Sequence, residues 1–371
     1  MSGGETTAPI DMTRTWAPQV PAFREVVERS LTAVARAPDL VSIIQRHRFH
    51  GSARDKQAGA DWLSNRLGAP PNPTRLLMTG GTQNTLMVLF SRLASQGAAI
   101  AAEKLTYAAI GQLAMLGRIS VLPVDIDEDG MRDDSLESLC KAHNLAAVYI
   151  NPTGHNPTTS MMSLERRQKV VRVARKYALP IIEDDVHGLI ANNPPPPLAS
   201  IAPDLTWYLM SVSKCLGIGL RTAFLIAPSD DGLADLLRPI PSVSSWFVPG
   251  LSAAIITHLI ESGAASHIVG QISKEIAARQ DIAQEMLGHL GMMRTNRSSL
   301  HVWIDLPPPW TAEPFIQAAR TKGVILRHPR VFATPGTNVE QNIRASLIAP
   351  STHEDLRRGL SVLATLLLSR T

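Results

Sequence analysis

The stretch Trp207-Tyr208-Leu209-Met210-Ser211-Val212-Ser213-Lys214 joins four large apolar residues to two serines and a lysine. An uninterrupted apolar run of this kind indicates a strand that is buried on both faces of a sheet. The lysine follows the strand at once, where burial would lower the pKa of its amine and favour a nucleophile. Arg221 comes seven residues later. The stretch therefore predicts a buried strand that delivers a reactive amine to one edge of a sheet.

Similar apolar runs recur through the centre of the chain and alternate with helical patterns such as Thr82–Leu93 and residues 163–178. The runs are 76–78, 119–122, 147–150, 180–182, 207–210 and 223–226. This alternation predicts the α/β class, with a large domain whose mostly parallel sheet is flanked by helices. Beyond it, a long helical stretch and short strands predict a smaller α+β domain. We expect the large domain at 46–244 and the small one at 1–45 and 245–371.

The composition excludes several classes of protein. Of the 371 residues, 44% are hydrophobic and 18% are charged, which argues against a disordered chain. No run of about 18 apolar residues is present, so we expect no membrane contact. The net charge is only +4 and no block of like charges stands out, so we expect no nucleic-acid partner. Two cysteines are too few for a disulfide framework, and we expect a cytoplasmic protein.

Polar residues follow several of the apolar runs. The first run leads into Thr79-Gly80-Gly81-Thr82-Gln83, which suits an anion at a helix N-terminus, although Thr82 could instead be an ordinary N-cap. The third and fourth lead into Asn151-Pro152-Thr153-Gly154-His155-Asn156 and Glu183-Asp184-Asp185. Ligands of parallel sheets bind beyond the carboxyl ends of the strands. We therefore expect an anion cradle, an amide, a carboxylate and a lysine in one site.

Two acidic stretches have alternative interpretations. Glu183-Asp184-Asp185 could hold a metal ion, although His187 is the only nearby residue of a second ligand type. Residues 125–130 resemble the start of an EF-hand loop, but Leu136 stands where the loop needs Glu, so we expect a solvated turn. Cys215 is expected to be a small buried filler rather than a nucleophile.

The ordered set of strand ends resembles the fold-type I pyridoxal-5′-phosphate enzymes, specifically the class I and II aminotransferases. It is most similar to the 2-aminoadipate-type aminotransferases and to the aminotransferase-like domain of MocR-type regulators. The Ser-x-Ser-Lys and Gly-Leu-Arg elements between Ser211 and Arg221 are its most specific part. The resemblance runs from about Ile10 to the end of the chain. It implies pyridoxal 5′-phosphate as cofactor, no metal, and a homodimer with sites at the interface.

The resemblance also implies roles for individual residues. Lys214 would hold the cofactor as a Schiff base and move the proton at the substrate Cα, and Asp184 would pair with the pyridinium nitrogen. Tyr107 would stack on the ring, unless it is a core aromatic. Arg344 would bind the substrate α-carboxylate beside Asn156, unless it is a surface arginine. The other implied cofactor contacts are Gly81, Thr82, Gln83, Asn156, His187, Ser211, Ser213 and Arg221.

The sequence departs from the family pattern at three places. His187 stands where a tyrosine usually donates to the ring oxygen, and histidine titrates near neutrality. Thr159 stands where the loop usually has glycine, and Gly154 could partly replace that flexibility. Residues 45–51 lack the tyrosine that usually reaches the neighbouring subunit's phosphate. Arg46 or Arg48 could serve the phosphate instead, or bind an acidic substrate group, or form a solvated basic loop.

These features predict an aminotransferase that moves an amino group from an amino acid to a 2-oxo acid. The alternatives are the ligand-sensing domain of a transcriptional regulator without its DNA-binding module, or a lyase, decarboxylase or racemase with the same cofactor. About ten residues precede the resemblance, too few for a winged helix, and Met1 favours a free-standing enzyme. Arg46, Arg48, Arg327 and Arg330 would suit an acidic substrate side chain such as that of aminoadipate or glutamate.

Overall fold

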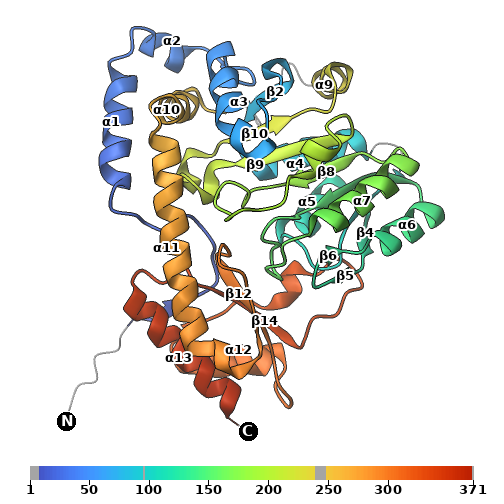
Figure 1. Cartoon of the computed structure of the whole chain (residues 1–371), viewed down its shortest axis with the longest axis vertical. Helices are drawn as coiled ribbons and strands as arrows, with labels where there is room; N and C mark the ends of the chain where they lie inside the picture. Colours follow the sequence, from blue (N-terminus) through green and yellow to red (C-terminus); the bar gives the residue numbers. More distant parts are fainter. Residues whose placement is uncertain (1–7, 95–96, 239–247, 370–371) are drawn as a thin grey trace.

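The computed structural model describes residues 8–94, 97–238 and 248–369, and Figure 1 shows a central sheet above a smaller group of strands and helices. The sheet has seven strands in the order β2-β10-β9-β8-β7-β3-β4. They are β2 (Leu76–Thr79), β3 (Ala99–Glu103), β4 (Val121–Val124), β7 (Leu145–Ile150), β8 (Ile181–Asp184), β9 (Thr206–Ser211) and β10 (Ala223–Ile226). Only β10 runs against its neighbours. The predicted α/β fold with a mostly parallel sheet is confirmed.

The register of β10 brings distant residues to one edge of the sheet. Ala223 at its start pairs with Thr79 at the end of β2 and with Ser211 at the end of β9. The carboxyl ends of β7 and β8 lie at the same edge, because both strands run parallel to β9. Residues that follow four strands, and those that precede β10, therefore meet at this edge.

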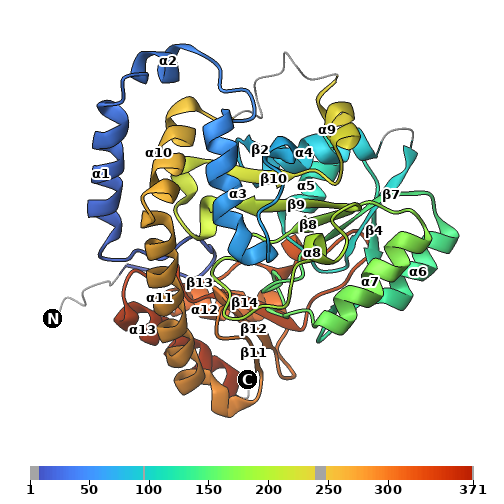
Figure 2. The same cartoon turned by 45° about the horizontal axis from the view of Figure 1, so that its top comes forward.

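Helices cover both faces of the sheet (Figure 2). One face carries α3 (Ala53–Leu67), α6 (Asp133–Ala142), α7 (Leu164–Lys176), α8 (Leu198–Ile201), α10 (Gly250–Glu261) and the first half of α11 (Ala264–Leu287). The other face carries α4 (Thr82–Leu93), α5 (Ala109–Gly117) and α9 (Asp230–Leu237). The predicted helix at Thr82–Leu93 matches α4, and Ser163 caps α7 through the backbone N–H of Arg166. The apolar strands are therefore buried on both sides.

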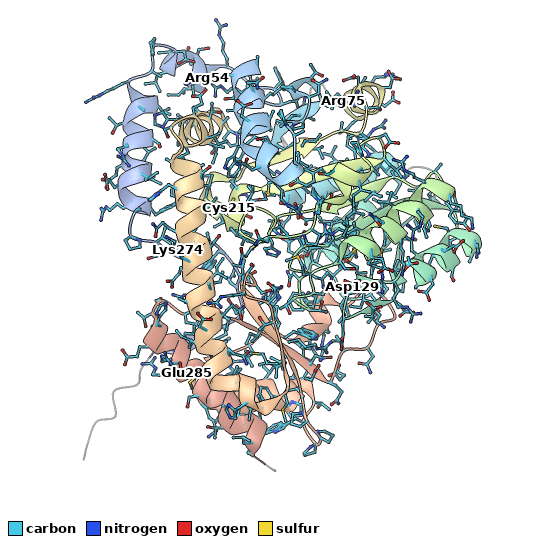
Figure 3. The ribbon with its side chains drawn as sticks, viewed as in Figure 1. Arg54, Arg75, Asp129, Cys215, Lys274 and Glu285 are labelled. Carbon is cyan, nitrogen blue, oxygen red and sulfur yellow. The ribbon has the colours of Figure 1, made fainter. Side chains whose placement is uncertain are left out.

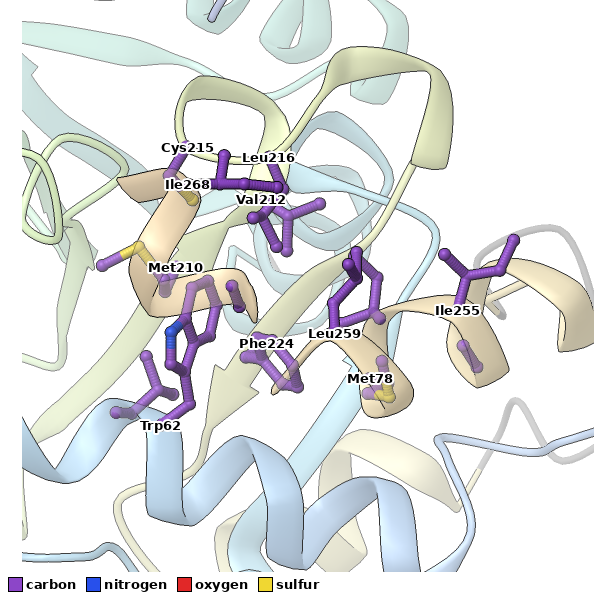
Figure 4. Packing of buried hydrophobic residues seen from close by; sticks show 14 of the residues in the cluster. Trp62, Met78, Met210, Val212, Cys215, Leu216, Phe224, Ile255, Leu259 and Ile268 are labelled. Carbon is purple, nitrogen blue, oxygen red and sulfur yellow. The ribbon is translucent and has the colours of Figure 1, made fainter. Parts of the chain in front are cut away.

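Figure 4 shows the core of the first face, where Phe224 of β10 lies beside Trp62 of α3. Their rings are 6.0 Å apart, close to edge-on. Cys215 belongs to the same buried cluster, and burial raises the pKa of its thiol to about 12. The thiol is therefore the buried filler that the sequence predicted. The core fixes the backbone immediately beyond Lys214.

The smaller part has a three-stranded antiparallel sheet with helices packed against it. It contains β11 (Met293–Arg294), β12 (His301–Asp305), β14 (Asn342–Ser346), α12 (Ala312–Thr321) and α13 (His353–Leu368). Near the start of the chain, β1 (Ile10–Asp11) pairs in parallel with β13 (Val324–Ile325). Segments near both ends of the described chain therefore contribute to this α+β unit. Among the described residues, no helix is long and apolar enough to cross a membrane.

The limits of the two domains stay a prediction. The boundary at 244/245 falls outside the described residues. The helices α1 (Phe23–Ala35) and α2 (Leu40–Gln45), assigned to the small domain from the sequence, pack with α10 against the core under the large sheet. The long helix α11 has Ile268 in that core and Leu287 in the core of the smaller part, so it connects the two.

Candidate active site

A pocket at the carboxyl edge of the large sheet brings together all the residues proposed for the cofactor. These are Gly81, Thr82, Gln83, Tyr107, Asn156, Asp184, His187, Ser211, Ser213, Lys214 and Arg221. The lining also contains Asn151, Val186, Ile218 and Thr222, which the sequence did not single out. The candidate substrate residue Arg344 is not part of this lining but donates through Nη1 to Asn156 Oδ1 at 3.0 Å. Segments that lie far apart in the sequence thus converge on one site.

One end of the pocket is built to hold an anion. The backbone of Gly81 has φ 102°, a conformation that favours glycine, and α4 begins at the next residue. Gly81, not Thr82, is the N-cap, and no side chain among the described residues caps the helix, so the N-cap interpretation of Thr82 is wrong. The N–H groups of the first turn therefore face the pocket together with the charge of Arg221 and the hydroxyl of Ser211. This combination suits a phosphate.

The carboxylate of Asp184 lies buried at the end of β8. Its Oδ2 accepts a hydrogen bond from the hydroxyl of Tyr149 at 2.8 Å. Burial raises the pKa of Asp184 to about 6, although Tyr149 and the backbone N–H of Val186 favour the charged form. Within the described ranges, Oδ1 makes no hydrogen bond of normal geometry. A buried acceptor without a donor is costly, so this oxygen suits a cationic N–H group of a bound molecule.

The amine of Lys214 is poised to exchange a proton near neutral pH. It lies in the wall of the pocket, largely withdrawn from water, and donates to the backbone carbonyl of Thr15. Burial, with a further contribution from the charge of Arg344, lowers the pKa of Lys214 to about 8, while Asp184 opposes the shift. A substantial neutral fraction therefore exists at physiological pH, and a neutral amine can attack a carbonyl carbon or accept a proton.

Tyr107 and His187 form two further walls of the pocket. The hydroxyl of Tyr107 accepts a hydrogen bond from Gln83 Nε2 at 2.9 Å, and its ring also packs against the core. His187 is buried next to Gly154, and its Nδ1 has no hydrogen-bond partner within the described part of the chain. Burial, aided by the charge of Lys214, lowers the pKa of His187 to about 4. The imidazole of His187 therefore stays neutral at the position where the family usually has a tyrosine.

Arg344 is buried on β14 and has no carboxylate within ion-pair distance among the described residues. Besides Asn156, its guanidinium donates to the backbone carbonyl of Thr13, and it stacks 4.6 Å from the ring centre of Phe332. Burial and the charge of Arg327 lower the pKa of Arg344 to about 9. The alternative that Arg344 is a surface arginine is therefore wrong. A buried cation of this kind suits an incoming carboxylate.

The comparison with known proteins agrees with this geometry. The sequence model of the family "Aminotransferase class I and II" matches residues 23–363. The chain belongs to the class I and II aminotransferases. The family's cofactor, pyridoxal 5′-phosphate, fits the pocket of this aminotransferase chain. The anion cradle suits its phosphate, and the amine of Lys214 suits its aldehyde. The Asp184 oxygen that has no partner among the described residues suits its ring nitrogen.

Relatives of this aminotransferase chain include regulators and enzymes. It is 30% identical over 310 residues to the uncharacterized HTH-type transcriptional regulator YdeF of Bacillus subtilis. The aligned residues cover 82% of this chain and 65% of YdeF. It is 25% identical to the 2-aminoadipate transaminase of Thermus thermophilus, over 71% of the chain and 67% of that protein. The chain spans 53% to 65% of the length of three such Bacillus regulators.

The fold is shared with solved aminotransferases. The structure of LysN, an α-aminoadipate aminotransferase from Thermus thermophilus, matches with a TM-score of 0.85 and 23% identity. The match covers 97% of this chain and 92% of LysN. The expectation of a fold-type I architecture is therefore confirmed.

The loop at residues 151–159 is ordered by hydrogen bonds and holds Thr159 in a left-handed conformation. The backbone N–H of Asn156 donates to Asn151 Oδ1 at 3.0 Å, which orders the loop under the pocket. Thr159 has φ 66°, so a buried β-branched residue occupies the left-handed conformation that glycine adopts without strain. Such a residue costs about 1–2 kcal/mol. Gly154 is also left-handed, with φ 59°, but does not remove the strain at Thr159.

The two acidic stretches are used by the fold. Glu183 accepts from two backbone N–H groups at the start of α8, and Asp185 forms an ion pair with Arg66 at 2.7 Å. Within the described ranges, no group of three potential ligands could hold a metal ion. Asp129, labelled in Figure 3, lies in the turn between β5 (Ile126–Asp127) and β6 (Gly130–Met131). Its carboxylate accepts a hydrogen bond from the hydroxyl of Ser163. This hairpin is the turn that the sequence predicted.

The sequence missed the buried ion network behind the pocket. Arg66 of α3 bonds both oxygens of Asp185, and the hydroxyl of Tyr208 donates to the same carboxylate at 3.0 Å. Arg66 and Arg167 both donate to Thr153 Oγ1, at 3.2 and 3.1 Å. This network holds the loop that carries Thr153 in place beside the pocket. The only available signal was an arginine at a position of α3 where the helical pattern turns toward the core.

Proposed function

We propose that the chain is a pyridoxal-phosphate-dependent aminotransferase that transfers an amino group from an amino acid to a 2-oxo acid. The observation that carries the proposal is the amine of Lys214 in the wall of the pocket, where burial, Arg344 and Asp184 together set its pKa to about 8. Lys214 is largely withdrawn from water and has no ion-pair partner among the described residues, so its charge does not stabilise the fold, since burying a charge is unfavourable. Its cost is explained if the amine has a chemical task.

The residues of the pocket divide the work as follows. When bound, pyridoxal phosphate supplies an electron sink that stabilises negative charge at the substrate Cα. Lys214 would hold the cofactor through Nζ and then accept and return the proton of the Cα. Asp184 would keep a proton on the ring nitrogen through its free Oδ1, and the cradle at Gly81 and Arg221 would fix the phosphate. Arg344 would orient the α-carboxylate of the substrate.

Retention of the cofactor by Lys214 tests the proposal directly. Protein loaded with pyridoxal phosphate should absorb visible light, and borohydride reduction should attach the cofactor to Lys214, as mass spectrometry can show. We expect Lys214→Ala to lose both the attachment and all amino-group transfer. Lys274→Ala is the matched control, because Lys274 is an exposed lysine of α11 (Figure 3). A wild-type protein that binds no cofactor would contradict the proposal.

A second candidate function follows from the relatives. The chain spans 65% of the length of YdeF, a protein named as a transcriptional regulator, so a ligand-sensing role is the alternative. A panel of amino acids with pyruvate or 2-oxoglutarate separates the two. Release of the matching 2-oxo acid supports transfer, whereas a change in cofactor absorption without product supports sensing. Carbon dioxide or a D-amino acid as product would instead indicate a decarboxylase or a racemase.

We further propose a cytoplasmic homodimer with its active sites at the subunit interface. The two cysteines are both free, which suits a reducing compartment. Ile218 lines the pocket and is 49% exposed, and Val41 and Ile44 of α2 are more exposed still. Apolar residues beside an active site suit a subunit contact. Light scattering after size-exclusion chromatography should give twice the mass of the chain, and a monomer would refute the dimer.

A further inference from the structure

Arg327 lies directly opposite Arg344 in the smaller part of the molecule. Arg327, two residues after β13, and Arg344 of β14 form an antiparallel β-bridge. Residues that face each other in this way have Cβ atoms about 4.5–5.5 Å apart and point to the same side of the sheet. Arg344 is buried against the pocket, whereas Arg327 is exposed. Arg344 therefore lies on the interior side of the pair, and Arg327 lies on its solvent side.

The charge of Arg327 acts on two residues of the site, Arg344 and Tyr107. It contributes to lowering the pKa of Arg344, and it also acts on the phenol of Tyr107 across the pocket. Within the described part of the chain, no carboxylate forms an ion pair with Arg327, and the nearby Glu313 and Glu340 lie against His328 instead. Two neighbouring cations without an anion between them repel each other. The arrangement is relieved when a molecule supplies two negative charges.

The other arginines that the sequence offered for an acidic group are placed differently. Arg48 forms an ion pair with Asp55 at 3.2 Å, and Arg330 donates to His328 Nδ1 at 3.0 Å. Arg46 is exposed directly after α2, and no contact among the described residues ties it to Arg344. At the periphery, arginines such as Arg54 are matched by glutamates (Figure 3). Of the four candidates, only Arg327 pairs with Arg344 in the described part of the chain.

We propose that Arg327 binds the side-chain carboxylate of the substrate, so that the preferred substrates are dicarboxylic amino acids and 2-oxo acids. The proposal rests on the aminotransferase function, in which Arg344 takes the α-carboxylate. The side chain of the substrate then extends toward solvent, where Arg327 meets its terminal carboxylate. Because Arg327 is exposed, its attraction is screened by salt, whereas that of the buried Arg344 is screened much less.

The test compares L-glutamate with L-glutamine, which has the same shape but a neutral amide. We expect Arg327→Gln to lower kcat/KM for glutamate roughly ten- to hundredfold, mainly through KM, and to change glutamine less than about twofold. Arg320→Gln is the control, because Arg320 is an exposed arginine at the end of α12. In the wild type, added salt should reduce the advantage of glutamate. Equal losses for both substrates, or an equal effect of the control, would overturn the proposal.

A binding measurement separates this proposal from the aminotransferase function. Calorimetry on the cofactor-loaded protein compares glutarate, with two carboxylates, and pentanoate, with one. We expect glutarate to bind at least about tenfold more tightly, and Arg327→Gln to remove the difference. If this holds while no amino acid is turned over, the second carboxylate site stands and the transfer reaction fails. If amino acids react but glutarate binds no better than pentanoate, the second carboxylate site fails alone.

Discussion

Two buried arginines hold the same loop but have opposite surroundings. Arg66 donates to Thr153 in the loop at 3.2 Å, and Arg344 donates to Asn156 at 3.0 Å. Although burial lowers it, the pKa of Arg66 is raised above its usual value because Asp185 lies 2.7 Å away. The pKa of Arg344 falls to about 9, since burial and Arg327 both act against its charge.

The difference indicates that Arg66 is part of the structural framework, whereas Arg344 is available for a ligand. Arg66 donates to Asp185, and Tyr208 donates to the same carboxylate, so the charge of Arg66 is balanced within the protein and requires no ligand. By contrast, Arg344 finds an amide oxygen and the backbone carbonyl of Thr13, and its Nε has no partner in the described ranges. A buried charge satisfied only by neutral groups is costly, and a substrate carboxylate would remove that cost.

Removing each arginine should break the comparison most clearly. Arg66→Met leaves Asp185 buried without its cation, and we expect the free energy of unfolding to fall by about 3–5 kcal/mol. Arg344→Met removes a charge that has no carboxylate partner within the described ranges, and we expect a change of less than about 1 kcal/mol. Urea unfolding of the cofactor-free protein measures both. Arg66→Lys keeps the charge and should lose less. Equal losses for the two methionine variants would refute the comparison.

Substrate kinetics should give the opposite ranking. Arg344→Gln should raise the barrier for α-amino acids by about 2–5 kcal/mol, which is a loss of roughly thirtyfold or more in kcat/KM. The cofactor-loaded variant should still absorb visible light, because Arg344 does not line the pocket, but the pH dependence of the absorption should shift, because the charge of Arg344 acts on the pKa of Lys214. An unchanged kcat/KM would show that this arginine does not bind the α-carboxylate.

The pH dependence of stability extends the comparison to Asp184, the buried carboxylate of the pocket. Burial raises the pKa of Asp184 from 3.8 to about 6, so the folded protein retains a proton that the unfolded chain loses. Stability therefore falls as pH rises from about 4 to 6, and a penalty of at most roughly 3 kcal/mol remains above pH 6. We expect Asp184→Asn to stabilise the cofactor-free protein by about 1–3 kcal/mol at pH 7 and little at pH 4. An equal gain at both pH values would contradict this.

The smallest effect concerns the loop that both arginines hold. Thr159→Gly should relieve the left-handed strain of about 1–2 kcal/mol but remove a buried methyl group worth about 0.8 kcal/mol. We expect a net gain of about 0.5–1 kcal/mol in thermal or urea unfolding. Thr158→Gly is the comparison variant, and it should lose stability because the Thr158 hydroxyl bonds His155 at 2.7 Å. A less stable Thr159→Gly protein would show that the loop has adapted to threonine.

The residues that the sequence proposed for the cofactor each lie within a few positions of a strand end, and the structure brings them into one pocket. The signals are local, and parallel strands bring their ends together. The strand Ala99–Glu103 was missed, since its small residues resemble neither an apolar run nor an alternating one. The strand predicted at 119–122 is displaced to Val121–Val124. Local patterns thus predict that a strand exists better than where it begins.

The rest of the site could not be predicted because its partners are far apart in the chain or carry no side-chain signal. Arg66 and Asp185 are 119 residues apart, and the sequence around either residue gives no signal that the two form a pair. Lys214 and Arg344 donate to backbone carbonyls of residues 15 and 13, which any amino acid could provide. The choice of Arg327 over the other three arginines needed the bridge to Arg344.

The pairing of β1 with β13 has a consequence for synthesis on the ribosome. Ile10 pairs with Val324, so the first strand emerges more than 300 residues before its partner. At 5–20 residues per second, it waits roughly 15–60 seconds, during which the strands of the large sheet are all complete. The carbonyls of residues 13 and 15 that meet Arg344 and Lys214 are therefore fixed late. We expect nascent chains stalled before Val324 to form the sheet without a closed substrate side.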